Sequence, residues 1–283
     1  MNSAEVAELL GNPSCQIDCK TVSAADEFSL RVYVFTPDGG GTGRPVVFIP
    51  GWTSVMDGWA PLLSSWVEKR VIYYIETREK CSCQAPKRRL KKSDYEMRKH
   101  TEDLEAVCKA LDIPNDALWF GSSLGGTVIL HGMMEGKLSG SGAFLISPNT
   151  KFRFSGWMVP LISMPWWFYP PLIRLCLPYL KFRLKERAQY IRYRRTLLNA
   201  NVLRLKRSVQ ANRRYDLPSE LDKINIPVAV CVAASDTLHT GDDSHGIADL
   251  LPQGQLLEVP SNQYAHEADI IADIDAWELA SQS

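Results

Sequence analysis

The segment Leu118-Trp119-Phe120-Gly121-Ser122-Ser123-Leu124-Gly125-Gly126 decides how this chain is interpreted. Its centre fits the pattern G-x-S-x-G, with Ser123 at the serine position and Ser122 one place too early. An apolar run suited to a buried strand precedes the motif, and a helix-compatible run, Ser123–Met134, follows it. A tight turn in that setting exposes the serine hydroxyl beside a helix N-terminus, whose dipole favours negative charge. The pattern predicts a nucleophile at Ser123; the alternative is a glycine-rich turn without a catalytic role.

Apolar strands and amphipathic helices alternate on both sides of this segment. The expected strands are Gln16–Val22, Phe28–Phe35, Val46–Ile49, Val71–Ile75, Ala117–Phe120, Ala143–Ile146, Pro227–Ala233 and Gln255–Val259. The expected helices are Asp57–Lys69, Ser93–Leu111, Ser123–Met134, Asp242–Leu250 and His266–Leu279. Such alternation predicts an α/β fold with a mostly parallel central sheet and helices on both faces.

The alternation stops between residues 150 and 219, which are rich first in Trp and Pro and then in Arg. We therefore expect an α/β core formed by residues 1–149 and 220–283, and a helical cap inserted at residues 150–219. The cap should lie over the carboxyl ends of the strands, where open α/β sheets place their sites. The apolar stretch Trp157–Leu180 contains five prolines and Arg174, which makes a membrane-spanning helix a poor interpretation.

Composition narrows the class of protein. The 283 residues include 32 Lys and Arg and 32 Asp and Glu, and this balance argues against a dedicated nucleic-acid binder. The seven cysteines are scattered, and neither Cys15/Cys19 nor Cys81/Cys83 has the usual spacing of a zinc site. The odd cysteine count and the lack of a signal-peptide pattern indicate a cytoplasmic protein. No metal and no organic cofactor is implied.

The motif, its setting and the order of elements resemble the α/β-hydrolase superfamily, in its serine-nucleophile, esterase- and lipase-like branch, over nearly the whole chain. Members of that branch carry their catalytic triad in the order Ser, acid, His. The resemblance implies Asp236, just beyond the strand Pro227–Ala233, as the acid and His266, after the last strand, as the general base. Asp242 and Asp243 are rival acids, but they suit the start of a helix.

Some members place the acid after the preceding strand instead. The matching positions here are Ser147, Pro148 and Asn149, and none of them is acidic. In the implied mechanism the histidine takes the serine proton during attack, and the aspartate fixes the tautomer of the imidazole.

The oxyanion hole should consist of two backbone N–H groups, those of Leu124 and Trp52. Trp52 lies in the loop after the strand Val46–Ile49, where the family often has His-Gly and this chain has Pro50-Gly51. The proline does not remove the backbone donor at Trp52. Gly51 has a second interpretation, in which it only allows a turn.

Two cations follow the strand Val71–Ile75. Arg78 and Lys80 should lie near the carboxyl edge of the sheet, where they could contact a substrate carboxylate. The alternative is that they pair with Glu76 or Glu79 and hold a loop.

The expected cap offers a pocket and a cationic segment. We expect the substrate pocket to be lined by Gly51, Trp157, Trp166, Trp167 and His239, which suits an apolar acyl or aromatic group. From Lys181 to Arg214 there are twelve basic residues and one acid, Glu186. This segment is either a solvated basic face or a peripheral contact with an anionic membrane.

These features together predict a serine hydrolase that cleaves a small-molecule carboxylic ester, with thioesters and lipid esters as variants, through an acyl-enzyme. A serine at position 123 argues against dehalogenases and epoxide hydrolases, which use aspartate, and against polyester synthases, which use cysteine. An acyltransferase, a cofactor-free haloperoxidase and a ligand-binding receptor remain as alternatives on the same fold. The sequence predicts neither the acyl chain nor the oligomeric state.

Overall fold

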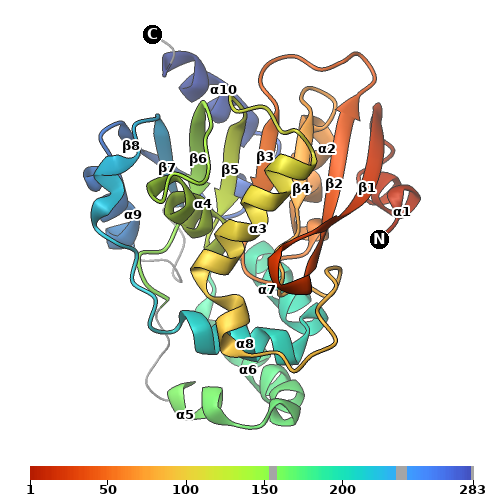
Figure 1. The fold of residues 1–283 in the computed structure, drawn as a ribbon, viewed down its shortest axis with the longest axis vertical. Helices are drawn as coiled ribbons and strands as arrows, with labels where there is room; N and C mark the ends of the chain where they lie inside the picture. The colour runs from red at the N-terminus through yellow and green to blue at the C-terminus, as the bar shows by residue number, and fades with distance from the viewer. Residues whose placement is uncertain (153–157, 234–240, 282–283) are drawn as a thin grey trace.

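The computed structural model describes residues 1–152, 158–233 and 241–281, and its centre is one eight-stranded sheet (Figure 1). The strand order is β1-β2-β4-β3-β5-β6-β7-β8. β2 is antiparallel to β1 and β4, and the neighbours from β4 to β8 are all parallel. The strands are β1 (Cys15–Ser23), β2 (Ser29–Pro37), β3 (Val46–Ile49), β4 (Ile72–Ile75), β5 (Leu118–Ser122), β6 (Gly142–Ile146), β7 (Val228–Ala233) and β8 (Gly254–Val259).

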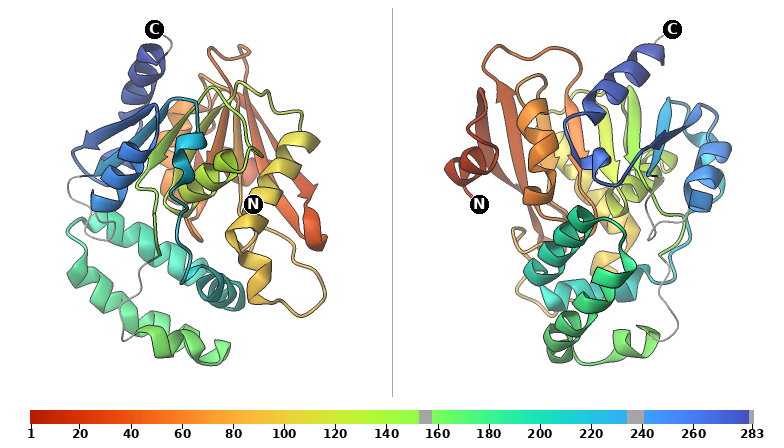
Figure 2. Two further views of the ribbon diagram at one scale, coloured as in Figure 1. Left: turned by 60° about the vertical axis from the view of Figure 1, so that its left-hand side comes forward. Right: turned by 180° about the vertical axis from the view of Figure 1, so that it is seen from behind.

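Helices cover both faces of this sheet, as the views in Figure 2 show. One apolar cluster joins the sheet to α3 (Met97–Ala110), α4 (Leu124–Met134) and α9 (Gly241–Leu250). The other joins its opposite face to α1 (Ser3–Leu9), α2 (Ala60–Trp66) and α10 (Ile270–Ala280). The central strands β3, β5, β6 and β7 are buried along their whole length, because successive side chains enter alternate clusters.

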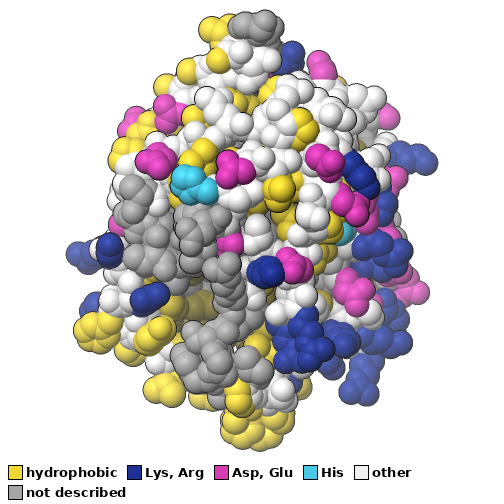
Figure 3. All heavy atoms as spheres, turned by 90° about the vertical axis from the view of Figure 1, so that its left-hand side faces the viewer, with side chains coloured by type: hydrophobic (Ala, Val, Ile, Leu, Met, Phe, Trp, Pro, Cys, Tyr) yellow, Lys and Arg dark blue, Asp and Glu magenta, His cyan; other side chains and the backbone are white. Residues whose placement is uncertain are grey.

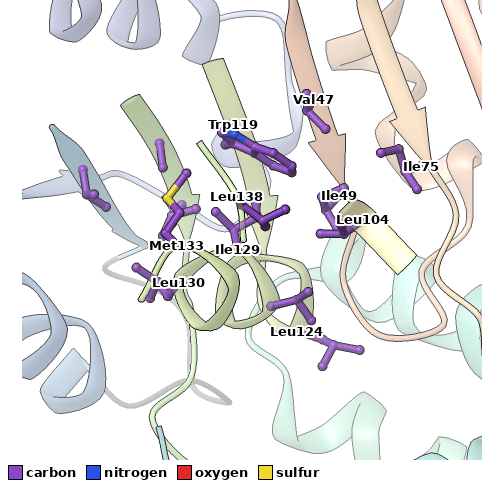
Figure 4. Packing of buried hydrophobic residues seen from close by; sticks show 14 of the residues in the cluster. Val47, Ile49, Ile75, Leu104, Trp119, Leu124, Ile129, Leu130, Met133 and Leu138 are labelled. Atoms are coloured by element: carbon purple, nitrogen blue, oxygen red, sulfur yellow. The ribbon is translucent and has the colours of Figure 1, made fainter. Parts of the chain in front are cut away.

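Figure 4 shows the first cluster from close by, with Val47 and Ile49 of β3 and Trp119 of β5 packed above Ile129 and Met133 of α4. This packing fixes α4 against the sheet and so fixes the turn that carries Ser123. The predicted fold class is confirmed.

Several helix boundaries differ from the prediction. The expected helix Asp57–Lys69 is a 3₁₀ turn, η2 (Met56–Trp59), followed by α2, which has proline in its first turn. The expected helix Ser93–Leu111 also begins with a 3₁₀ turn, η3 (Lys92–Tyr95). The last helix was wrongly predicted to begin at His266, which instead lies in η6 (Tyr264–His266), before α10. The apolar pattern was continuous across these turns, so it did not reveal where the helical bonding breaks.

The described residues between β6 and β7 include four α-helices, and we call them the helical insertion: α5 (Met158–Ser163), α6 (Tyr169–Arg183), α7 (Arg187–Asn199) and α8 (Val202–Asn212). They contact the loops that follow parallel strands. Arg195 of α7 pairs with Asp57 after β3, and Arg204 of α8 donates to the Cys83 carbonyl oxygen after β4 at 2.8 Å. The insertion therefore covers the carboxyl edge of the sheet, the lower end in Figure 1. Within the described residues, no helix has the length and apolar character needed to cross a bilayer.

Candidate active site

Ser123 occupies a strained turn between β5 and α4. Its backbone has φ 48° and ψ −115°, a conformation that L-residues rarely adopt, and its N–H donates to the Ile146 carbonyl oxygen of β6 at 2.8 Å. Leu124 begins α4 directly afterwards, so its amide belongs to the first turn, whose N–H groups have no acceptor within the helix.

The glycines of the motif are required by close packing around this turn. A Cβ at Gly121 would lie 2.5 Å from Ile129 Cδ1, and a Cβ at Gly125 would lie 2.2 Å from the Ile49 carbonyl oxygen. Any larger residue at either position would separate α4 from the sheet. The G-x-S-x-G pattern is thus explained by the path of the backbone.

Asn149 holds the hydroxyl of Ser123. Its Nδ2 donates to Ser123 Oγ at 3.0 Å, and its backbone N–H donates to Thr127 Oγ1 at 2.9 Å. In this bond Oγ is the acceptor, and a serine hydroxyl that accepts a hydrogen bond still carries one O–H donor of its own. The sequence interpretation considered Asn149 only as a position that lacks an acid. Its place directly after β6, the strand beside β5, was the signal that could have revealed it.

The loop after β3 lies against Ser123. A Cβ at Gly51 would lie 3.6 Å from Ser123 Cβ, so the two residues are neighbours in space. Thr53 has φ 51°, and its N–H donates to Glu79 Oε1 at 3.1 Å. The indole of Trp52, between these two residues, lies edge-on to Phe152 with 6.0 Å between ring centroids. The structure thus places Gly51, the residue before Trp52, beside the nucleophile turn.

The carboxylate of Glu79 holds the loop after β3 in place. The side chain is fully buried, and its Oε1 also accepts a bond from Thr77 Oγ1 at 2.7 Å. The carboxylate therefore stabilises the left-handed turn at Thr53, one residue beyond the expected oxyanion donor. The sequence interpretation gave Glu79 only the role of a partner for Arg78 or Lys80.

The predicted partner of Arg78 is wrong. Its guanidinium forms a bidentate pair with Asp103 of α3, at 2.6 and 2.5 Å, and its Cζ lies 4.4 Å from the centroid of the Phe28 ring. Arg78 is fully buried, so it holds a loop and does not contact a substrate. Asp103 is 25 residues away in the chain, and only the packing of α3 on the sheet brings the two together.

His266 lies where the loops after β3 and β8 meet. Its ring stacks on Trp59 with centroids 4.0 Å apart and planes at 21°, and its Nδ1 lies 2.8 Å from the Asn262 carbonyl oxygen. A hydrogen on Nδ1 that points at this carbonyl leaves Nε2 as an acceptor. Trp59 is anchored in turn by a bond from its Nε1 to Ser54 Oγ at 3.0 Å.

The helical insertion fixes the loop that carries this histidine. The carboxylate of Glu186 accepts the backbone N–H of Asn262 at 3.0 Å and that of Gln263 at 2.8 Å. Arg192 of α7 also donates to the Asn262 side chain. The insertion and the histidine loop are therefore connected by charge-assisted hydrogen bonds.

Other predicted site residues lie apart or outside the described residues. Asp236, His239 and Trp157 fall outside them. Trp166 and Trp167 are described and are more than half exposed, which does not support their predicted place in a pocket. The rival acid Asp243 lies on α9, and its Oδ1 accepts a bond from Thr150 Oγ1 at 2.5 Å.

His100 is a further buried titratable group. It lies on α3, and its side chain is 1% exposed. Burial lowers the pKa of His100 to about 4. Within the described residues neither ring nitrogen has a hydrogen-bond partner, so His100 is held in its neutral form.

No family model matches this sequence, and no curated protein matches it. Solved structures do match. An esterase from Rhodococcus sp. ECU1013 has a TM-score of 0.74 at 18% identity, over 93% of this chain and 99% of that one. A thermophilic esterase from Thermogutta terrifontis has a TM-score of 0.73 at 16% identity, over 95% of this chain and 100% of that one. A hydrolase from Pseudomonas aeruginosa PA01 has a TM-score of 0.70 at 18% identity, over 93% of this chain and 96% of that one.

The sheet order, the strained serine turn and these neighbours define the class of fold. The chain has the α/β-hydrolase fold, as the sequence predicted. The described residues contain no cluster of three or more side chains that could ligate a metal.

Proposed function

We propose that this protein is a serine hydrolase that cleaves a carboxylic ester through an acyl-enzyme formed on Ser123. The observation that carries the proposal is the left-handed backbone of Ser123 at the β5–α4 turn, beside the loop of Gly51 and Trp52. Strain of this kind persists only where the surrounding structure holds it, and it is common at catalytic nucleophiles. The named neighbours are esterases and hydrolases, which agrees with this activity.

Each group has a role in the proposed reaction. Ser123 Oγ attacks the ester carbonyl carbon while His266 Nε2 takes its proton, and Asp236 orients the imidazolium together with the Asn262 carbonyl. The carbonyl oxygen becomes an oxyanion that accepts bonds from the N–H groups of Leu124 and Trp52. His266 returns the proton to the departing alcohol, leaving the acyl group on Ser123. Water activated by His266 then releases the acid.

The substrate in this proposal is a small ester with an apolar acyl or aromatic part. The insertion covers the carboxyl edge of the sheet, so the acyl group reaches Ser123 between the insertion and the loop after β3. Phe152, edge-on to Trp52, gives this approach an aromatic wall.

The test is fluorophosphonate labelling together with hydrolysis of p-nitrophenyl esters. We expect the wild type to be labelled and active, and Ser123→Ala to lose labelling and at least roughly 10⁴-fold of kcat. The matched control is Ser122→Ala, the neighbouring serine in the same motif, which should retain both. His266→Gln and Asp236→Asn should each lower kcat strongly while the fold remains intact.

Other outcomes would contradict the proposal in distinct ways. A folded wild type without labelling would exclude Ser123 as an activated nucleophile. Labelling at Ser123 without turnover of any ester would favour a ligand-binding receptor. Full activity in Asp236→Asn would leave the Asn262 carbonyl as the group that orients His266.

A further inference from the structure

Large apolar side chains are exposed mainly on the helical insertion. Among the residues that the structure describes, eight of the eleven exposed large hydrophobic side chains lie between Trp166 and Leu198. Phe182 is 88% exposed and Leu175 is 74% exposed. Figure 3 shows apolar side chains at the lower end of the molecule, the end at which Figure 1 places the insertion. Exposure concentrated in this way marks an interaction surface.

Five of these side chains lie on α6 or in the turn directly before it, and we call this set the α6 face: Trp166, Trp167, Leu175, Tyr179 and Phe182. The last three are spaced by four and three residues along α6, so they lie on the same side of the helix. The two tryptophans lie in the turn η4 (Trp166–Phe168), directly before α6 begins. Trp and Tyr combine an apolar body with a polar tip and collect at membrane–water interfaces.

The α6 face belongs to a segment of the chain that is rich in positive charge. Between Trp166 and Leu198 there are eight Lys and Arg residues and one acid, Glu186, in a chain whose total charges balance. Glu186 accepts the amide groups of the histidine loop, so its charge is directed towards the core. The exposed cations of this segment are Arg174, Lys181, Arg183, Lys185, Arg187 and Arg194, and Arg195 pairs with Asp57.

We propose that the α6 face docks on the surface of an anionic lipid membrane. The aromatic and aliphatic side chains enter the headgroup region, and the surrounding lysines and arginines contact lipid phosphates. α6 has 15 residues, and it would lie in the plane of the interface. A second copy of this chain fits less well, because two α6 faces would bring like charges together. The proposal does not depend on the activity proposed for Ser123.

Vesicle co-sedimentation tests this docking. The probes are vesicles of phosphatidylcholine alone and vesicles that also contain phosphatidylserine, at low and raised salt. We expect binding to the mixed vesicles that weakens with salt. The double variant Leu175→Ser/Phe182→Ser should bind at least roughly tenfold more weakly, because two exposed side chains lose their apolar burial in lipid. Lys181→Ser/Lys185→Ser should weaken binding to the mixed vesicles by an order of magnitude or more, at roughly fivefold per charge.

The matched control is Leu279→Ser. Leu279 is 72% exposed, like Leu175, but it lies on α10 at the opposite end of the molecule (Figure 1). All variants are at exposed positions, so circular dichroism should show an unchanged fold. The proposal is overturned if the wild type binds neither kind of vesicle, or if Leu279→Ser weakens binding as much as Leu175→Ser/Phe182→Ser does. It is also overturned if the wild type is a dimer that the double variant converts to a monomer, since the face would then join two copies.

Discussion

Replacing Gly125 by alanine tests whether the close contact between α4 and β3 positions the nucleophile. A Cβ at this position would lie 2.2 Å from the Ile49 carbonyl oxygen and 2.9 Å from the Pro50 carbonyl oxygen. Both atoms are backbone, so no side-chain rotation relieves the overlap. The start of α4 must therefore move away from β3 by about 1 Å before the contact becomes acceptable.

The magnitude follows from two opposing effects. Overpacking of this kind costs about 1–3 kcal/mol, and a clash with backbone belongs at the upper end of that range. Alanine favours helix over glycine by about 1 kcal/mol. We expect Gly125→Ala to lower the free energy of unfolding by about 2 kcal/mol. Because Leu124 moves with α4 relative to Trp52, kcat should also fall about 100-fold, as expected for a 1 Å displacement of reacting groups.

The matched control is Gly126→Ala, one residue further along the same helix. A Cβ there would lie 3.3 Å from the Pro148 Cβ, a side-chain atom, so a small shift suffices. Urea unfolding measures the stability, and ester hydrolysis or the rate of fluorophosphonate labelling measures the reactivity of Ser123. Wild-type stability and rate in Gly125→Ala would refute the argument. Equal losses of stability and rate in Gly125→Ala and Gly126→Ala would also refute it.

Two further predictions concern buried groups away from the nucleophile. His100 has a folded-state pKa near 4, below its unfolded value, so protonation favours the unfolded state and stability should fall as the pH drops from about 6.5 to 4, by about 3 kcal/mol in total. In His100→Phe this part of the acid sensitivity should vanish. Urea unfolding at neutral and mildly acidic pH measures it, and an equal loss of unfolding free energy in both proteins would contradict the reasoning. Arg78→Gln leaves Asp103 buried without its charge partner and should cost about 3–5 kcal/mol. Arg195→Gln breaks only the exposed pair with Asp57 and should cost less than about 1 kcal/mol, so similar melting temperatures for these two variants would contradict the burial argument.

The order of elements was predictable from local sequence. Strands such as Val46–Ile49, whose bounds match β3, are short apolar runs between turns, and both of their faces are buried. The nucleophile turn was equally local, because its glycines are neighbours of Ser123 in the chain. What the pattern could not resolve was the distinction between a 3₁₀ turn and the first turn of a helix, as at Trp59 and His266.

The sequence by itself therefore determined the α/β class, the sheet strands and the serine turn, since each depends on residues within a few positions of one another. Tertiary structure alone decided the partners of three side chains: Asn149 for Ser123, Asp103 for Arg78, and Trp59 for His266. These pairs join residues that are far apart in the chain, and hydrophobic burial of the sheet faces brings them together. Their hydrogen bonds and ring contacts leave no periodic pattern in the sequence, because each depends on where two separate elements meet.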